Sequence, residues 1–160
     1  MAKKSSPAIR LVEARLASQL VKTQYDLGTN PRALFPLAFS VQAPTPTDVE
    51  WTYRNKQVTA RVSYRLIAQQ TDEDAESDVE ETGQKEVLRI EVTYDLIGSV
   101  QRKPTAAQAT QFGVGESQLT VYPLFRSAVM QITGHAGFPT LVLPSSEAIL
   151  ARESDVEEED

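Results

Sequence analysis

Two segments of this chain alternate apolar and polar residues so regularly that they restrict the fold more than any other feature. They run from Val58 to Ala68 and from Glu86 to Leu96. Side chains of a strand point to opposite faces in turn, so each segment has one apolar face and one wet face. This pattern is typical of an antiparallel sheet that is covered on one side. An acidic segment joins the two strands, which predicts a hairpin with a long connection.

The first third of the chain supplies weaker patterns. Apolar residues in 6–19 recur at approximately helical spacing, which predicts a short amphipathic helix. Alternation over residues 34–42 predicts a strand, and two prolines at 44 and 46 predict a turn after it. Residues 48–54 form a shorter candidate strand that carries Trp51, the only tryptophan. Together with the hairpin, these segments predict a four-stranded sheet.

The apolar period changes after Pro104. Apolar residues in 116–135 recur as a continuous helical stripe, and Gly134 and Gly137 are placed to end the helix. A short final helix is expected over 145–152. We therefore predict an α+β fold: a four-stranded antiparallel sheet packed on a long C-terminal helix plus a short final helix.

Two acidic runs carry the net charge of −6. Residues 72–81 contain seven acids, and the last eight residues contain six. Such runs are usually solvated, and contact with a basic partner is the alternative. Nucleic acid is not an expected partner, because these acids repel phosphate and there is no basic stripe interleaved with aromatic residues. We predict a partly helical N-terminal extension at 1–18, a domain at 19–152 containing an acidic loop at 72–85, and a disordered acidic tail at 153–160.

The composition points to the cytoplasm and away from catalysis. The chain has no cysteine, which agrees with a reducing compartment and removes thiolate chemistry. Its basic start is interrupted by charges, unlike a secretory signal, and no apolar stretch is long enough for membrane insertion. His135 is the only histidine and has no partners at metal-ligand or catalytic spacing. We expect no catalytic residue, no metal and no cofactor, and hence not an enzyme.

The segment FPTLVLP, residues 138–144, is an apolar connector that cannot be a regular helix, because prolines stand at 139 and 144. Such a segment must be covered or used. There are two alternatives: either the connector packs over the domain's own core, or its apolar residues Phe138, Leu141 and Leu143 partly line a groove for an apolar chain of another molecule. Composition leaves both possibilities open.

The stretch VYPLFRSAVMQITGHAGFPTLVLP, residues 121–144, resembles the SecB family of export chaperones. The family's aromatic-Pro-x-x-Arg signature is matched by Tyr122, Pro123 and Arg126. Its Gly-containing turn and Phe-Pro-x-Leu-x-Leu connector are matched by Gly137, Phe138, Pro139, Leu141 and Leu143. Residues 35–44, FPLAFSVQAP, and the strands that follow are similar in order and spacing, so the resemblance covers residues 19–150.

The resemblance implies a homotetramer, a dimer of dimers, that binds unfolded clients in apolar grooves without ATP and meets the SecA motor. The residues it assigns to clients are Phe35, Leu37, Phe39, Trp51, Phe138, Pro139, Leu141 and Leu143. Those it assigns to helix packing and assembly are Tyr122, Phe125, Arg126, Val129 and Ile132. The N-terminal extension and the acidic insertion look more like the SecB-like branch that accompanies toxin–antitoxin modules, whose client is an antitoxin. A structural protein that reuses the fold is a third possibility.

Overall fold

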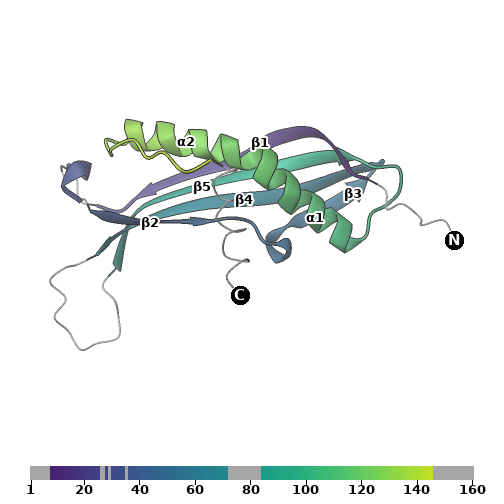
Figure 1. The fold of residues 1–160 in the computed structure, drawn as a ribbon, viewed down its shortest axis with the longest axis horizontal. Helices are drawn as coiled ribbons and strands as arrows, with labels where there is room; N and C mark the ends of the chain where they lie inside the picture. The colour runs from purple at the N-terminus through teal and green to yellow at the C-terminus, as the bar shows by residue number, and fades with distance from the viewer. Residues whose placement is uncertain (1–7, 26–27, 29, 35, 72–83, 146–160) are drawn as a thin grey trace, which may run out of the picture.

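Five antiparallel strands form one sheet in a computed structural model, which describes residues 8–25, 28, 30–34, 36–71 and 84–145 (Figure 1). The strands are β1 (Arg10–Thr23), β2 (Leu37–Gln42), β3 (Glu50–Arg54), β4 (Gln57–Thr71) and β5 (Gln84–Ser99). Their order is β1-β5-β4-β2, and β3 also pairs with β4. The α+β antiparallel fold is thus confirmed, with five strands rather than four.

The central hairpin is the pair β4–β5, as the alternation predicts. Its register runs from Gln57 opposite Ser99 to Thr71 opposite Gln84. Both strands are longer than predicted, and Gln84 and Lys85 belong to β5 rather than to a loop. The remainder of the expected acidic loop, residues 72–83, lies outside the described part of the chain.

Strands β2 and β3 share one edge of β4. β3 pairs with the first residues of β4 through a two-residue turn, and β2 pairs with its last residues. Asn55 and Lys56 in that turn have φ values of 51° and 58°, as a type I′ turn requires. Between β2 and β3, Thr45 caps a short 3₁₀ turn at Pro46–Asp48. The predicted strands at 34–42 and 48–54 are therefore confirmed in shortened form.

The predicted N-terminal helix is wrong, because these residues form β1, a 14-residue strand at the edge of the sheet. β1 pairs with β5 along its whole length, from Arg10 opposite Ser99 to Thr23 opposite Leu88. Its register shifts twice, between Leu11 and Glu13 and between Leu16 and Ser18. Each shift inserts an extra residue and changes which face the following side chains occupy. The spacing of apolar residues consequently resembles that of a helix.

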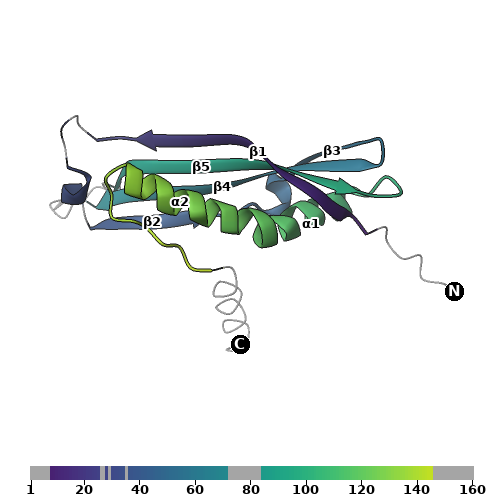
Figure 2. The ribbon, with the colours of Figure 1, turned by 90° about the horizontal axis from the view of Figure 1, so that it is seen from above.

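One helical layer covers one face of the sheet (Figure 2). It consists of α1 (Ala106–Glu116), a π-helical segment (Ser117–Val121) and α2 (Tyr122–His135). The layer begins ten residues before the predicted start at residue 116. It starts at Thr105, whose hydroxyl accepts from the amide of Gln108 while the Gln108 side chain accepts from the amide of Thr105. It ends near Gly137, which has a φ of 81°.

The core lies between the helical layer and the alternating residues of β4 and β5. Val58, Ala60, Val62, Tyr64 and Leu66 of β4 are each at most 2% exposed. Gly113 of α1 permits a close contact with the sheet side of the core, because a Cβ there would lie 2.7 Å from a methyl group of Val49. The predicted final helix and acidic tail, at 146–160, lie beyond the described residues.

Candidate binding surface

After α2 the connector turns back along the helix on its β2 side (Figure 2). Three polar bonds hold it there. The amide of Leu141 donates to Thr133 Oγ1 at 3.0 Å, Arg126 Nε donates to the carbonyl of Leu143 at 2.5 Å, and the Tyr122 hydroxyl donates to the carbonyl of Pro144 at 2.6 Å. The connector is thus fixed to α2 over most of its length, although it forms no regular secondary structure.

This attachment buries two side chains that the sequence assigns to client binding. Phe138 is 4% exposed and its ring makes an edge contact with Tyr25 at 5.9 Å between centroids. Leu143 is 6% exposed. Both belong to the core of the single chain, where neither side chain lines an open groove, and their assignment to client binding stays a prediction. The backbone bonds to α2 explain the burial, because they turn these two side chains inward.

Other apolar side chains remain accessible beside the connector and β2. Leu37, Phe39 and Leu141 are partly buried, Val41 is 42% exposed and Val142 is 58% exposed. We call these five residues the β2 margin. Val41 and Val142 are absent from the residues assigned from sequence, although an extended connector places Val142 opposite its neighbours Leu141 and Leu143.

Two of the remaining expected client residues, Pro139 and Trp51, are described and do not belong to the β2 margin. Pro139 is exposed at the start of the connector. Trp51 is partly buried on β3, opposite Ala60, beyond the 3₁₀ turn that separates β3 from β2. Phe35 lies outside the described residues. The structure therefore brings Leu37, Phe39 and Leu141 to the same margin and leaves Trp51 away from it.

The residues expected to pack the helix do so within a single chain. Tyr122, Phe125 and Val129 are at most 4% exposed. Tyr64 of β4 stacks on Phe125 with 5.3 Å between ring centroids and lies 5.6 Å from Tyr122. Burial raises the pKa of Tyr64, so its hydroxyl stays protonated. Ile132 is partly buried, and Arg126 holds the connector.

A second apolar surface lies on the outer side of the helical layer. Leu119 is 70% exposed, Leu124 is 43% exposed and Met130 is 40% exposed. We call these residues the outer helix face. On edge strand β1, Leu16 and Val21 are also 49% and 42% exposed. Exposed large apolar side chains of this kind are candidates for contact with a partner.

The other face of the sheet is polar and carries several ion pairs. Arg61 binds Asp95 with two bonds of 2.8 and 2.9 Å, and Arg65 binds Glu91 at 2.8 Å. The bonds from Arg61 lower the pKa of Asp95. Similar pairs join Arg89 to Glu86 and Arg15 to Glu13.

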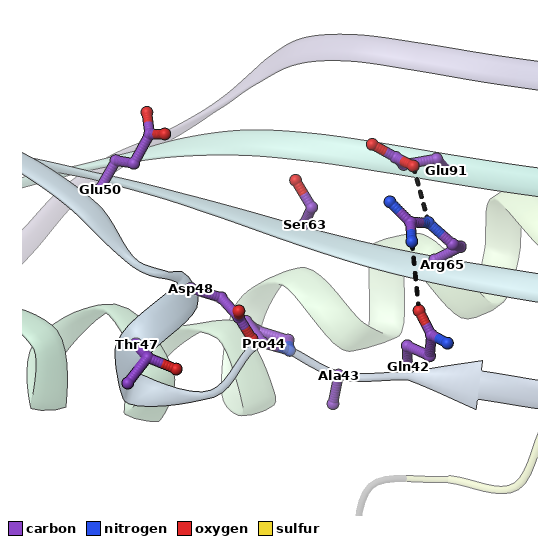
Figure 3. A pocket seen from close by; sticks show the side chains of 9 residues that line it. All are labelled: Gln42, Ala43, Pro44, Thr47, Asp48, Glu50, Ser63, Arg65 and Glu91. Atoms are coloured by element: carbon purple, nitrogen blue, oxygen red, sulfur yellow. Dashed lines mark hydrogen bonds and ion pairs between the residues drawn. The ribbon is translucent and has the colours of Figure 1, made fainter.

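Figure 3 shows a polar pocket of about 370 Å³ on this face. Arg65 lies in it between Glu91 and Gln42, and Asp48 accepts from the amide and hydroxyl of Thr45. These bonds lower the pKa of Asp48. Arg65 and Asp48 are thus both engaged by neighbouring groups. The lining residues are Gln42, Ala43, Pro44, Thr47, Asp48, Glu50, Ser63, Arg65 and Glu91.

His135 is exposed at the end of α2, as expected. Within the described residues no group of three or more His, Asp or Glu side chains is placed to hold a metal ion. In the same part of the chain, no helix has the length and apolarity needed to cross a membrane.

Comparison with known proteins gives a match among solved structures. No protein-family model matches the sequence, and no curated protein matches it. Among solved structures, the fold is similar to the Mycobacterium tuberculosis Rv1957 SecB-like chaperone in complex with a ChAD peptide from the Rv1956 HigA1 antitoxin. The TM-score is 0.62 at 15% sequence identity, over 85% of this chain and 88% of that chain. The chain therefore has the SecB-like fold, which confirms the resemblance at the level of the fold.

Proposed function

We propose, starting from this SecB-like fold, that the protein is a chaperone that binds apolar segments of non-native polypeptides without ATP. The observation that carries the proposal is the β2 margin, where exposed Val41 and Val142 lie beside partly buried Leu37, Phe39 and Leu141. No chemical step is part of the proposed function, and no cofactor is required.

Two physical properties suit the β2 margin to clients of varied sequence. Burial of apolar surface is non-directional and contributes roughly 25 cal/mol per Å², whichever apolar side chain is buried. β2 is also an edge strand, since within the described residues it pairs only with β4. An extended client segment beside it can form main-chain hydrogen bonds that do not depend on client sequence.

A second candidate function is a chaperone dedicated to one antitoxin. The observation that favours it is the bound antitoxin peptide in the structurally similar mycobacterial protein. In that case the β2 margin would bind one preferred segment rather than many. Competition separates the two functions: a dedicated chaperone releases a labelled antitoxin peptide only to the same peptide, whereas a general chaperone releases it equally to unrelated unfolded proteins.

We also propose that the protein takes part in the export of preproteins through SecA. The resemblance places SecA on the polar face of the sheet, yet four acids there, Glu13, Glu86, Glu91 and Asp95, are already bound to arginines. A basic partner would have to displace these arginines. Pull-down of SecA by the full-length chain at low ionic strength tests this interaction directly.

We also propose a cytoplasmic homotetramer. The outer helix face supports assembly, because Leu119, Leu124 and Met130 lie exposed on a helical layer that is otherwise packed against the sheet. Burying this face between copies would remove apolar surface from water. None of the residues of the β2 margin belongs to the helical layer, so assembly through the helices can leave the margin accessible.

The client site is tested by a double variant, Val41→Asp with Val142→Asp. Each substitution places a charge at an exposed position, so the fold is retained while an apolar client is repelled. The measurement is light scattering from a chemically unfolded protein diluted into buffer without ATP. We expect the unaltered protein to suppress aggregation and the double variant to lose most of this suppression.

Leu20→Asp provides the matched control, because Leu20 is 50% exposed on β1, at the other edge of the sheet from β2. This variant should suppress aggregation as well as the unaltered protein does. Full suppression by the double variant would refute the site, and failure of the unaltered protein to suppress aggregation of any client would refute the function.

A further inference from the structure

One end of the sheet gathers basic side chains from three segments. Arg54 and Lys56 lie at the β3–β4 turn, Arg102 and Lys103 lie between β5 and α1, and Arg10 is the first residue of β1. All five side chains are exposed. We call this set the basic end. None of its residues takes part in the proposed client site.

The backbone holds these segments together. The amide of Val100 donates to the carbonyl of Lys56 at 3.0 Å, which joins the two loops. The register places Arg10 opposite Ser99, Ser99 opposite Gln57, and Gln57 opposite Arg54, so the three segments share one row at the end of the sheet. The amino-terminal end of α1 lies next to them, and its first turn has no acid to offset the helix dipole.

Two acids on the neighbouring strands β1 and β5 are already engaged. Glu13 binds Arg15 at 3.1 Å, and Asp95 binds Arg61 at 2.8 Å. Lys56 also has a φ of 58°, a backbone conformation that favours glycine over lysine. The positive charges of the basic end repel one another, so an acidic segment bound there would stabilise it.

We propose that the acidic segment 153–160 of the same chain docks on the basic end. Six of its eight residues are acidic. Its attachment point is suitable, because the carbonyl of Pro144 is held by Tyr122, which lies against Tyr64 of β4. From Tyr64 to Gln57 the strand spans about 23 Å. Residues 146–152 span about 24 Å when extended and about 10 Å as the helix that the sequence predicts. The eight residues of segment 153–160 add up to about 27 Å, so the acidic segment reaches the basic end in either case.

The other acidic run of the chain cannot reach this site in the same molecule. Residues 72–81 are attached between Thr71 and Gln84, at the opposite end of β4 from Gln57. The length of β4 places these ends about 45–50 Å apart. Charge complementarity and reach therefore both select segment 153–160. In its docked position the segment acts as an electrostatic cover that keeps other polyanions off the basic end.

The natural absence of cysteine makes a direct test possible. Asp160→Cys introduces a single thiol for a nitroxide spin label on the full-length chain. We expect paramagnetic broadening of the backbone amides of residues 54–57 and 100–103 at low salt, and its loss at about 0.5 M salt, where charges are screened within a few Å. Amides of residues 69–71 and 84–86, at the far end, should stay sharp. Equal broadening at both ends would overturn the proposal.

Two variants locate the docking site. Lys56→Gly with Arg102→Gln and Lys103→Gln should abolish the broadening. Lys22→Gln with Arg32→Gln and Lys85→Gln removes the same number of charges at the far end and should leave the broadening unchanged. The proposal fails if the two triple variants behave alike. It also fails if spin-labelled, unenriched chains broaden the amides of unlabelled, isotope-enriched chains, because docking would then be between molecules.

If segment 153–160 occupies the basic end, polyanions should bind there more tightly when this segment is removed. A chain ending at Arg152 should bind polyglutamate and a single-stranded oligonucleotide at least tenfold more tightly than the full chain at low salt. If the full chain binds the oligonucleotide as tightly as the shortened chain, the basic end is a nucleic-acid site and tail docking is refuted. Client suppression is unaffected in either case, so these results are distinct from the test of the chaperone.

Discussion

Thr133 holds the connector on the helix through a single hydroxyl group. Its Oγ1 donates to the carbonyl of Val129 at 2.8 Å and accepts from the amide of Leu141 at 3.0 Å, and the side chain is 1% exposed. This acceptor fixes the place where the connector leaves the end of α2. Because the same bond orients Leu141 beside β2, one residue links helix packing to the β2 margin.

Replacing Thr133 with valine should therefore destabilise the protein by about 1–2 kcal/mol, since valine keeps the shape but leaves the Leu141 amide without its acceptor. Urea unfolding measures the loss, and hydrogen exchange at Leu141 should accelerate. Thr110→Val is the matched control, because the Thr110 hydroxyl also donates to the carbonyl four residues earlier, at 3.0 Å. We expect that variant to change stability by less than about 0.5 kcal/mol. Similar losses in both variants would contradict the role of Thr133.

At the scale of an element, α1 depends on glycine where it approaches the sheet. A Cβ at Gly113 would lie 2.7 Å from Val49 and 3.3 Å from Ala60, whereas a Cβ at Gly115 meets nothing within 4 Å. Alanine favours a helix over glycine by about 1 kcal/mol. Gly115→Ala should thus stabilise the protein by about 0.5–1 kcal/mol, whereas overpacking should make Gly113→Ala destabilising by about 1–3 kcal/mol. Thermal unfolding should show a higher Tm for Gly115→Ala and a lower Tm for Gly113→Ala than for the unaltered protein. Tm shifts of the same sign in both variants would disprove the close packing.

The β4–β5 pairing also has an acid-sensitive element. Arg61 lowers the pKa of Asp95 below its ordinary value of 3.8, so the folded state gains stability above that value and loses it as the pH falls through the lowered pKa. Asp95→Asn should be less stable than the unaltered protein at pH 7, and the difference should shrink as the pH falls below about 4. Urea midpoints at pH 7, 4 and 3 measure this. A difference that stays constant with pH would rule out the ion pair as its source.

Elements with an unbroken period could be predicted from the sequence, and elements with an interrupted period could not. β4 and β5 alternate without interruption in their central residues, so their pairing follows from the pattern. In β1, two register shifts break the alternation and make Leu11, Leu16 and Leu20 look helical. α1 has few apolar residues and contains glycines, so its pattern is too weak to place the start of the helical layer.

The candidate site was predictable in part for a related reason. Leu37 and Phe39 follow from the alternation of β2, and the family resemblance assigns both to client binding together with residues of the connector. The inward orientation of Phe138 and Leu143 depends on bonds to Arg126 and Thr133, which lie on a different element. Local pattern does not say on which side an extended segment returns along a helix.

At the scale of the whole molecule, the outer helix face governs assembly. Leu119→Lys with Met130→Lys places two charges on this face and should separate the copies, because a buried unpaired ammonium group is strongly unfavourable. Light scattering coupled to size exclusion should show four times the chain mass for the unaltered protein and a lower mass for the variant. Its circular dichroism should be unchanged. An unaltered protein that is already monomeric, or a variant of unchanged mass, would contradict assembly through this face.

The closed end of the β4–β5 hairpin has a practical consequence. Thr71 and Gln84 are paired with each other, so the ladder is complete before the chain enters residues 72–83. The entropy of closing a longer segment grows only slowly with its length. The hairpin end is therefore a suitable insertion site. A reporter module or an epitope inserted between these two residues would enlarge the protein while leaving its core, the β2 margin and the outer helix face unchanged.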